Sequence, residues 1–193
     1  MHVSVDQSDG ELTLHTSREG AASSIGHDLT LRLGSWTGEV DLDADEVVRS
    51  VRVVGAVRSL EVIRGDGGLL PLSAQDKDII RENALEHLRA RIHAEVVFDA
   101  RAVRVTTGAH RMVGEASIAG VTKPLAVDVV LQREGEQMKL EASCAIKQSD
   151  FGITPFSGML GALRVSDRVT VRAKVRVVPD SRGREAEGDR CSD

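Results

Sequence analysis

Alternation of apolar and polar residues with a period of two runs through most of this 193-residue sequence. In the clearest stretch, "RVSDRVTVRAKVRVV" (residues 164–178), valine and alanine fill one set of alternate positions, and arginine and lysine fill much of the other. Successive side chains on a β-strand point to opposite faces, so this pattern predicts a strand with one buried and one solvated face. A chain of such strands must bury its apolar faces in a sandwich or a barrel.

The same alternation recurs in both halves of the chain and predicts about eight antiparallel strands. Residues 124–147, "PLAVDVVLQREGEQMKLEASCAIK", read as a hairpin that turns near Gly135. One segment has a helical period instead: residues 72–90, "LSAQDKDIIRENALEHLRA", where Ser73 and Asp76 form the pattern of a capping box. We therefore expect a mainly β domain with one inserted α-helix.

Length and side-chain size refine this expectation. A chain of this length suits one domain, which we assign to residues 1–178. Residues 179–193 carry almost no apolar side chains and predict a disordered polar tail. Small residues at expected inward positions favour a barrel with an open or ligand-filled lumen over a sandwich, although the helix and loops could fill that space.

Composition and motifs exclude several classes of function. A net charge of −5 and 2% aromatic residues argue against nucleic-acid binding. The sequence contains no apolar run long enough to span a bilayer, and no secretory signal is visible. A cytoplasmic location is therefore expected. The sequence has no nucleotide-binding or catalytic motif, and its six histidines are dispersed, so we expect no enzyme activity, no metal and no cofactor other than a bound lipid.

The segment "SDFGITPFSGMLGALRVSD" (residues 149–167) holds two of the three phenylalanines. Its glycines and proline interrupt any long helix, while its large apolar side chains need a surface to cover. It is expected to fold over a barrel mouth, either as the wall or lid of a pocket or as a plug. Both readings stay open.

Several motifs together resemble the YceI-like family of polyisoprenoid-binding proteins. They are "GEASIAGVTKPLAVDVVL" (residues 114–131), "AIKQSDFGI" (145–153) and "VSDRVTV" (165–171), with "SIGHDLTL" (24–31) and "ENALEHL" (82–88) in the family's order. The resemblance implies a single antiparallel lipocalin-like β-barrel that holds a long isoprenoid chain in its lumen without catalysis.

These observations give a predicted ligand site in the lumen and at its mouth. Its predicted lining residues are Trp36, Phe98, Ala116, Val127, Leu140, Ala142, Cys144, Ile146, Phe151, Phe156, Met159 and Leu160. His27 and Asp150 border apolar stretches and are the candidate polar groups at the mouth.

Two functions follow from the sequence. The preferred one is a soluble, non-catalytic protein that stores or transports a long-chain apolar ligand, such as a polyisoprenoid, an isoprenoid quinone or a similar lipid. The alternative is a ligand-free protein-interaction or stress-response module with a filled barrel. The expected partner is a small hydrophobic ligand, and formation of a homodimer is left open.

Overall fold

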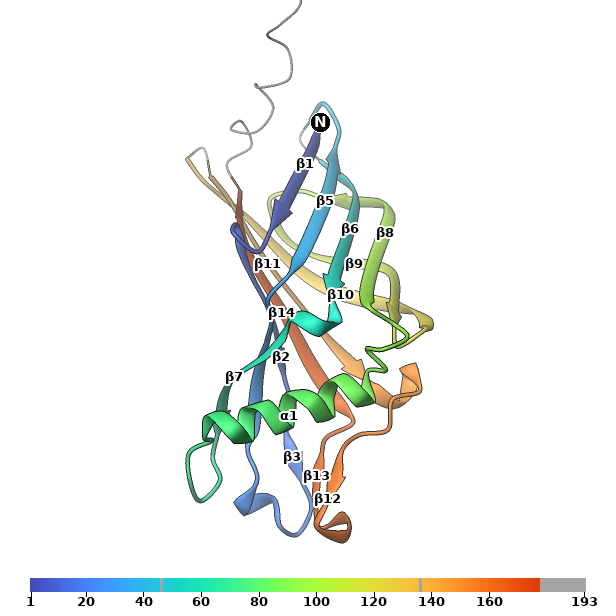
Figure 1. Cartoon of the computed structure of the whole chain (residues 1–193). Helices are drawn as coiled ribbons and strands as arrows, with labels where there is room; N and C mark the ends of the chain where they lie inside the picture. Colours follow the sequence, from blue (N-terminus) through green and yellow to red (C-terminus); the bar gives the residue numbers. More distant parts are fainter. Residues whose placement is uncertain (46, 136, 178–193) are drawn as a thin grey trace, which may run out of the picture.

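The computed structural model describes residues 1–45, 47–135 and 137–177 (Figure 1). The strands are β1 (His2–Asp6), β2 (Gly10–His15), β3 (Arg18–Glu19), β4 (Asp28–Leu33), β5 (Trp36–Leu42), β6 (Val48–Ala56), β7 (Leu60–Asp66), β8 (Glu95–Val105), β9 (Gly108–Ile118), β10 (Val121–Glu134), β11 (Gln137–Lys147), β12 (Ser157–Gly158), β13 (Leu163–Val165) and β14 (Arg168–Val177). The helices are α1 (Ala74–His87) and the short 3-10 helices η1 (Ser23–Ile25), η2 (Val57–Ser59), η3 (Gln148–Phe151) and η4 (Met159–Gly161). The predicted tail, residues 179–193, lies outside the described residues.

The main sheet is antiparallel throughout and has the strand order β1-β5-β6-β8-β9-β10-β11-β14-β2-β4-β7. A second, small sheet has the order β12-β13-β3. The mainly β class and the single α-helix are confirmed within the described residues. The fold is a curled antiparallel sheet of the β-barrel class.

The expected number of strands, about eight, is wrong, because the main sheet has eleven. Three long extended segments of the chain are each divided into two strands by a short connection. Residues 7–9 separate β1 from β2, Gly34–Ser35 separate β4 from β5, and η2 separates β6 from β7. The runs on either side of each break stay in one sheet: β1 pairs with β5 while β2 pairs with β4, and β6 pairs with β5 while β7 pairs with β4. Each break therefore adds a strand without changing the architecture.

Helix α1 follows local sequence rules closely. The Ser73 side chain accepts a hydrogen bond from the Asp76 backbone amide (3.1 Å), and the Asp76 carboxylate accepts one from the Ser73 amide (2.9 Å). This is the predicted capping box, and it satisfies amides that would otherwise lack a partner at the helix start. The predicted apolar stripe, Ile80, Ala84, Leu85 and Leu88, packs against buried side chains of the sheet.

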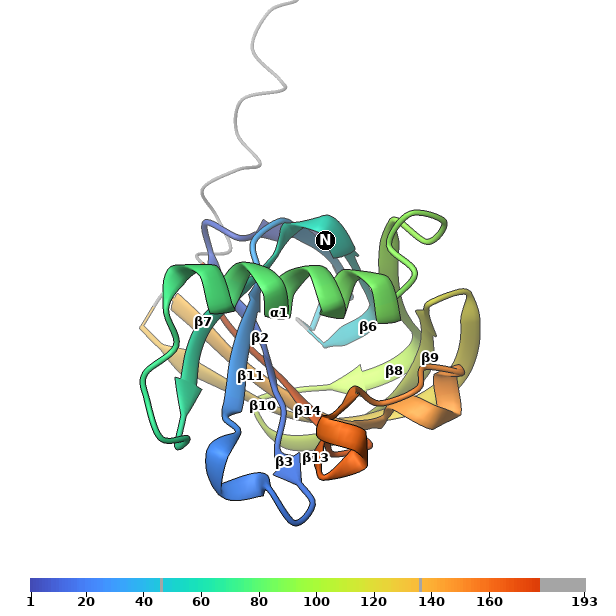
Figure 2. The same cartoon turned by 60° about the horizontal axis from the view of Figure 1, so that its bottom comes forward.

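Helix α1 also marks one end of the molecule. Figures 1 and 2 show it lying across the curled sheet, at the end where β3, β12 and β13 gather. It packs against β7, one of the two edge strands of the main sheet. None of the helices in the described part of the chain is both long enough and apolar enough to cross a bilayer.

Candidate functional site

The curled sheet holds an internal cavity of about 600 Å³, here called the central cavity. Inward side chains of all eleven main-sheet strands line it, together with Ile80 and Ala84 of α1 and Leu88 just after the helix. The lining is almost entirely aliphatic. This volume lies within the range of roughly 300–1,000 Å³ that is typical of small-molecule sites.

Strand alternation explains why the lining is apolar and why space remains. On β11 the cavity-lining residues include Leu140, Ala142, Cys144 and Ile146, which occupy alternate positions. Ala142 lies opposite Ala173 of β14 in the strand register. Two methyl side chains side by side fill little volume, so the cavity is wider at this part of its wall.

Most of the predicted site residues line the central cavity. They are His27, Trp36, Phe98, Ala116, Val127, Leu140, Ala142, Cys144, Ile146 and Phe156. They come from β5 and the four strands β8–β11, together with one position just before β4 and one just before β12. The inward face of the strands was therefore predictable from the period-two pattern.

Phe151, Asp150, Met159 and Leu160 are not among the lining residues, so their predicted place in the lumen or at its mouth is corrected. Phe151 is buried in a separate cluster with Ala116, Ala119 and Ile153, while Asp150 is exposed. Gly152, in the left-handed region (φ 66°), turns the chain after Phe151 and brings Ile153 to the cavity wall.

The 3-10 turn η4 carries Met159 and Leu160 away from the cavity. Met159 is 59% exposed and Leu160 is fully exposed, and both have a positive φ. Phe156 and Leu163, on either side of the turn, do line the cavity. The segment 149–167 thus contributes Ile153, Phe156 and Leu163 to the cavity wall, packs Phe151 in a separate cluster, and projects its tip into solvent.

Helix α1 contributes two polar lining residues that the sequence analysis did not select, Asn83 and His87. The His87 ring meets the Phe156 ring edge to face, with centroids 6.2 Å apart and an interplanar angle of 84°. Asn83 and His87 are four residues apart and lie next to the stripe of Ile80 and Ala84, so helical periodicity was the signal that could have found them.

Two other polar lining residues are already held by main-chain carbonyls. The Arg18 guanidinium donates to the carbonyls of Gly26 (2.6 Å) and Asp66 (3.1 Å). His27 Nε2 donates to the carbonyl of Leu70 (2.9 Å). These contacts tie the loops at this end of the sheet together and reduce the capacity of both side chains to bind a polar ligand group.

The one cysteine of the cavity lining, Cys144, carries little nucleophilic character. Burial, with a smaller contribution from the negative charge of Asp128, raises the pKa of the Cys144 thiol to about 11. A thiol with this pKa is protonated at neutral pH, and the protonated form is neither a good nucleophile nor a metal ligand. Across the described ranges, no three His, Cys, Asp or Glu side chains are grouped as a metal site would require.

The fold and the cavity together define a β-barrel-class protein built around an internal apolar site. The family model of the YceI-like domain matches residues 4–177, and the chain belongs to the YceI-like family. The resemblance found in the sequence is thereby confirmed.

Solved structures of this family share the fold at low sequence identity. BcnA of Burkholderia cenocepacia is 12% identical, with a TM-score of 0.60, and the match covers 86% of this chain and 96% of BcnA. The YceI protein of Campylobacter jejuni is 14% identical, with a TM-score of 0.57, and the match covers 78% of this chain and 85% of that protein. At these identities the likeness concerns the fold alone. No curated protein matches the sequence significantly.

Proposed function

We propose that this protein binds one long-chain apolar ligand in the central cavity, for storage or transport and without catalysis. The ligand class is a polyisoprenoid, an isoprenoid quinone or a similar lipid. The observation that carries the proposal is the cavity itself, about 600 Å³ of space with an almost entirely aliphatic lining. Because the protein's own side chains leave a cavity of this size open, the alternative, an interaction module with a filled barrel, is disfavoured.

The energetics of such a site favour a long chain over a short one. Each buried CH₂ group contributes ~0.8 kcal/mol, whereas association costs roughly 4–15 kcal/mol in lost freedom of motion. A ligand therefore needs on the order of ten buried carbon atoms before binding becomes favourable. At ~30 Å³ for each water-sized group, the cavity has room for roughly twenty.

The chemistry of the lining supports binding rather than catalysis. Arg18 and His27 are engaged with main-chain carbonyls, and the Cys144 thiol is protonated at neutral pH. Nucleophilic catalysis needs an activated nucleophile beside a base that can take its proton. Location in the cytoplasm stays a prediction of the sequence, and formation of a homodimer stays open.

A series of prenyl alcohols tests this proposal through chain length. Trp36 lines the cavity, is the sole tryptophan, and the chain contains no tyrosine, so intrinsic fluorescence reports on the site directly. Geraniol, farnesol and geranylgeraniol should bind with affinities that rise at least tenfold at each added isoprene unit until the cavity is full. A chain-length-independent response, or none with any of the three, would contradict the proposed function.

A further inference from the structure

The side chain of Trp36 places an unpaired hydrogen-bond donor inside the molecule. Trp36 is 5% exposed, and within the described ranges its indole nitrogen Nε1 is the one fully buried side-chain nitrogen or oxygen without a hydrogen-bond partner. Buried polar groups in folded proteins almost always have a partner, because an unpaired donor loses its hydrogen bonds to water without replacement. The missing acceptor therefore asks for an explanation.

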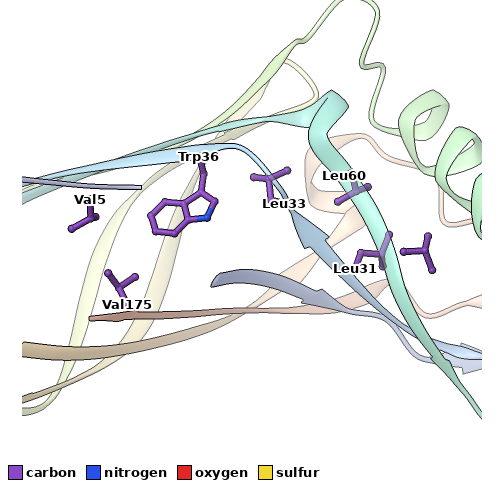
Figure 3. Close-up of a cluster of buried hydrophobic side chains, with 7 residues drawn as sticks. Val5, Leu31, Leu33, Trp36, Leu60 and Val175 are labelled. Carbon is purple, nitrogen blue, oxygen red and sulfur yellow. The ribbon is translucent and has the colours of Figure 1, made fainter. Parts of the chain in front are cut away.

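The apolar side chains packed around Trp36 offer no acceptor to its indole nitrogen. The buried cluster around it consists of Val5, Leu31, Leu33, Leu60, Val62 and Val175, all aliphatic. Figure 3 shows the ring projecting from the start of β5, with its nitrogen-bearing edge turned toward the side where Leu31 and Leu33 lie rather than toward Val5. Trp36, Leu31 and Leu33 all line the central cavity.

Main-chain contacts place Trp36 at the start of β5. The Trp36 main-chain amide donates to the Gln7 side chain (3.2 Å), and Trp36 lies opposite Gly55 in the register of β5 and β6. A side chain at Gly38 would come within 3.8 Å of the ring and 2.9 Å of Val5. The indole ring therefore lies close to Gly38, and its Nε1 is fully buried without a hydrogen-bond partner.

We propose that Trp36 Nε1–H donates a hydrogen bond to an oxygen carried by the bound chain, of the carbonyl class found in ketones, esters and quinones. This inference rests on the proposed function and adds the chemistry and position of one ligand group. The oxygen lies enclosed beside β5, not at the mouth among Arg18 and His27. Trp36 is then the residue that makes the site prefer an oxygenated chain over a plain hydrocarbon.

Two matched ligands test this role: farnesylacetone, an isoprenoid ketone of a size suited to the cavity, and the hydrocarbon in which CH₂ replaces its carbonyl. The wild-type protein should bind the ketone about tenfold more tightly than the hydrocarbon, as measured by native mass spectrometry. In Trp36→Phe, which keeps an aromatic ring but has no N–H, the ratio of the two affinities should fall to about one. Ultraviolet resonance Raman spectra of wild type should show the indole N–H becoming hydrogen-bonded only with the ketone.

Phe98→Leu is the control, because Phe98 lines the same cavity but offers no N–H. It should weaken both ligands by the same factor and keep their ratio near ten. Equal affinities in wild type, or a preference that survives Trp36→Phe, would overturn the role of Trp36 while leaving the proposed function intact. If neither ligand binds to wild type, the proposed function fails and this inference fails with it.

Discussion

Replacing Ala142 with tryptophan is expected to abolish ligand uptake and leave a folded β protein. Ala142 lines the central cavity and faces Val129 and Ala173 across the strand register, so a larger side chain has nowhere to point except into the cavity. An indole there occupies space that the ligand needs, and we expect the dissociation constant to rise by about a hundredfold or more. Native mass spectrometry with farnesylacetone measures the loss, and circular dichroism checks the fold.

Ala145→Trp provides the matched control. Ala145 lies on the same strand β11, three residues further along, but its side chain is exposed and is not part of the cavity lining. The same substitution on the outer face should leave the dissociation constant unchanged. A folded Ala142→Trp protein that still binds the ligand at wild-type strength would mean that the binding site lies elsewhere.

Gly114→Ala is expected to lower the free energy of unfolding by about 1–3 kcal/mol. A Cβ atom at Gly114 would lie 2.6 Å from the carbonyl oxygen of Asp99, 2.7 Å from Cζ of Phe98 and 2.8 Å from Cβ of Ala100. Two of these three atoms belong to, or are bonded directly to, the backbone of β8, so the methyl group can be accommodated only if the strands shift apart. Thermal unfolding should show a melting temperature lower by roughly 5 °C.

Gly158→Ala separates this crowding from the general effect of replacing a glycine. There the new Cβ would meet only the Phe156 ring, at 3.3–3.4 Å, and the backbone at Gly158 is in the extended region that alanine also adopts. Its melting temperature should change by less than about 2 °C. If Gly114→Ala were equally mild, the close packing of β9 on β8 around Phe98 would be wrong.

Local rules made much of the fold predictable. Alternation in residues 124–147 predicted the hairpin of β10 and β11, and Ser73 with Asp76 predicted the start of α1. The breaks in the long strands were harder to see, because apolar residues continue on both sides of each one. The signal was a slip in the period: Trp36 follows Leu33 by three positions instead of two, and so does Leu60 after Val57. A one-residue slip reverses which face a strand presents, and a short bend absorbs it.

The cavity lining was predictable where a strand period fixed the direction of the side chains, as at Leu140, Ala142 and Cys144. It was not predictable between Phe151 and Leu160, because glycines and proline leave that segment without a period. Phe151 and Leu160 are both large and apolar, yet one is buried in a side cluster and the other is exposed. Only the tertiary path of the chain decides between those outcomes.

Native mass spectrometry of freshly purified protein, paired with organic extraction and lipid analysis of the same sample, tests the central claim most directly. The account predicts one apolar, isoprenoid-like molecule bound per chain, which is released on extraction and carries a carbonyl-class oxygen. A mass equal to that of the chain alone, unchanged after incubation with polyprenyl and quinone lipids, would contradict it. That result would favour the alternative, a protein whose barrel serves as a scaffold for interaction with other proteins.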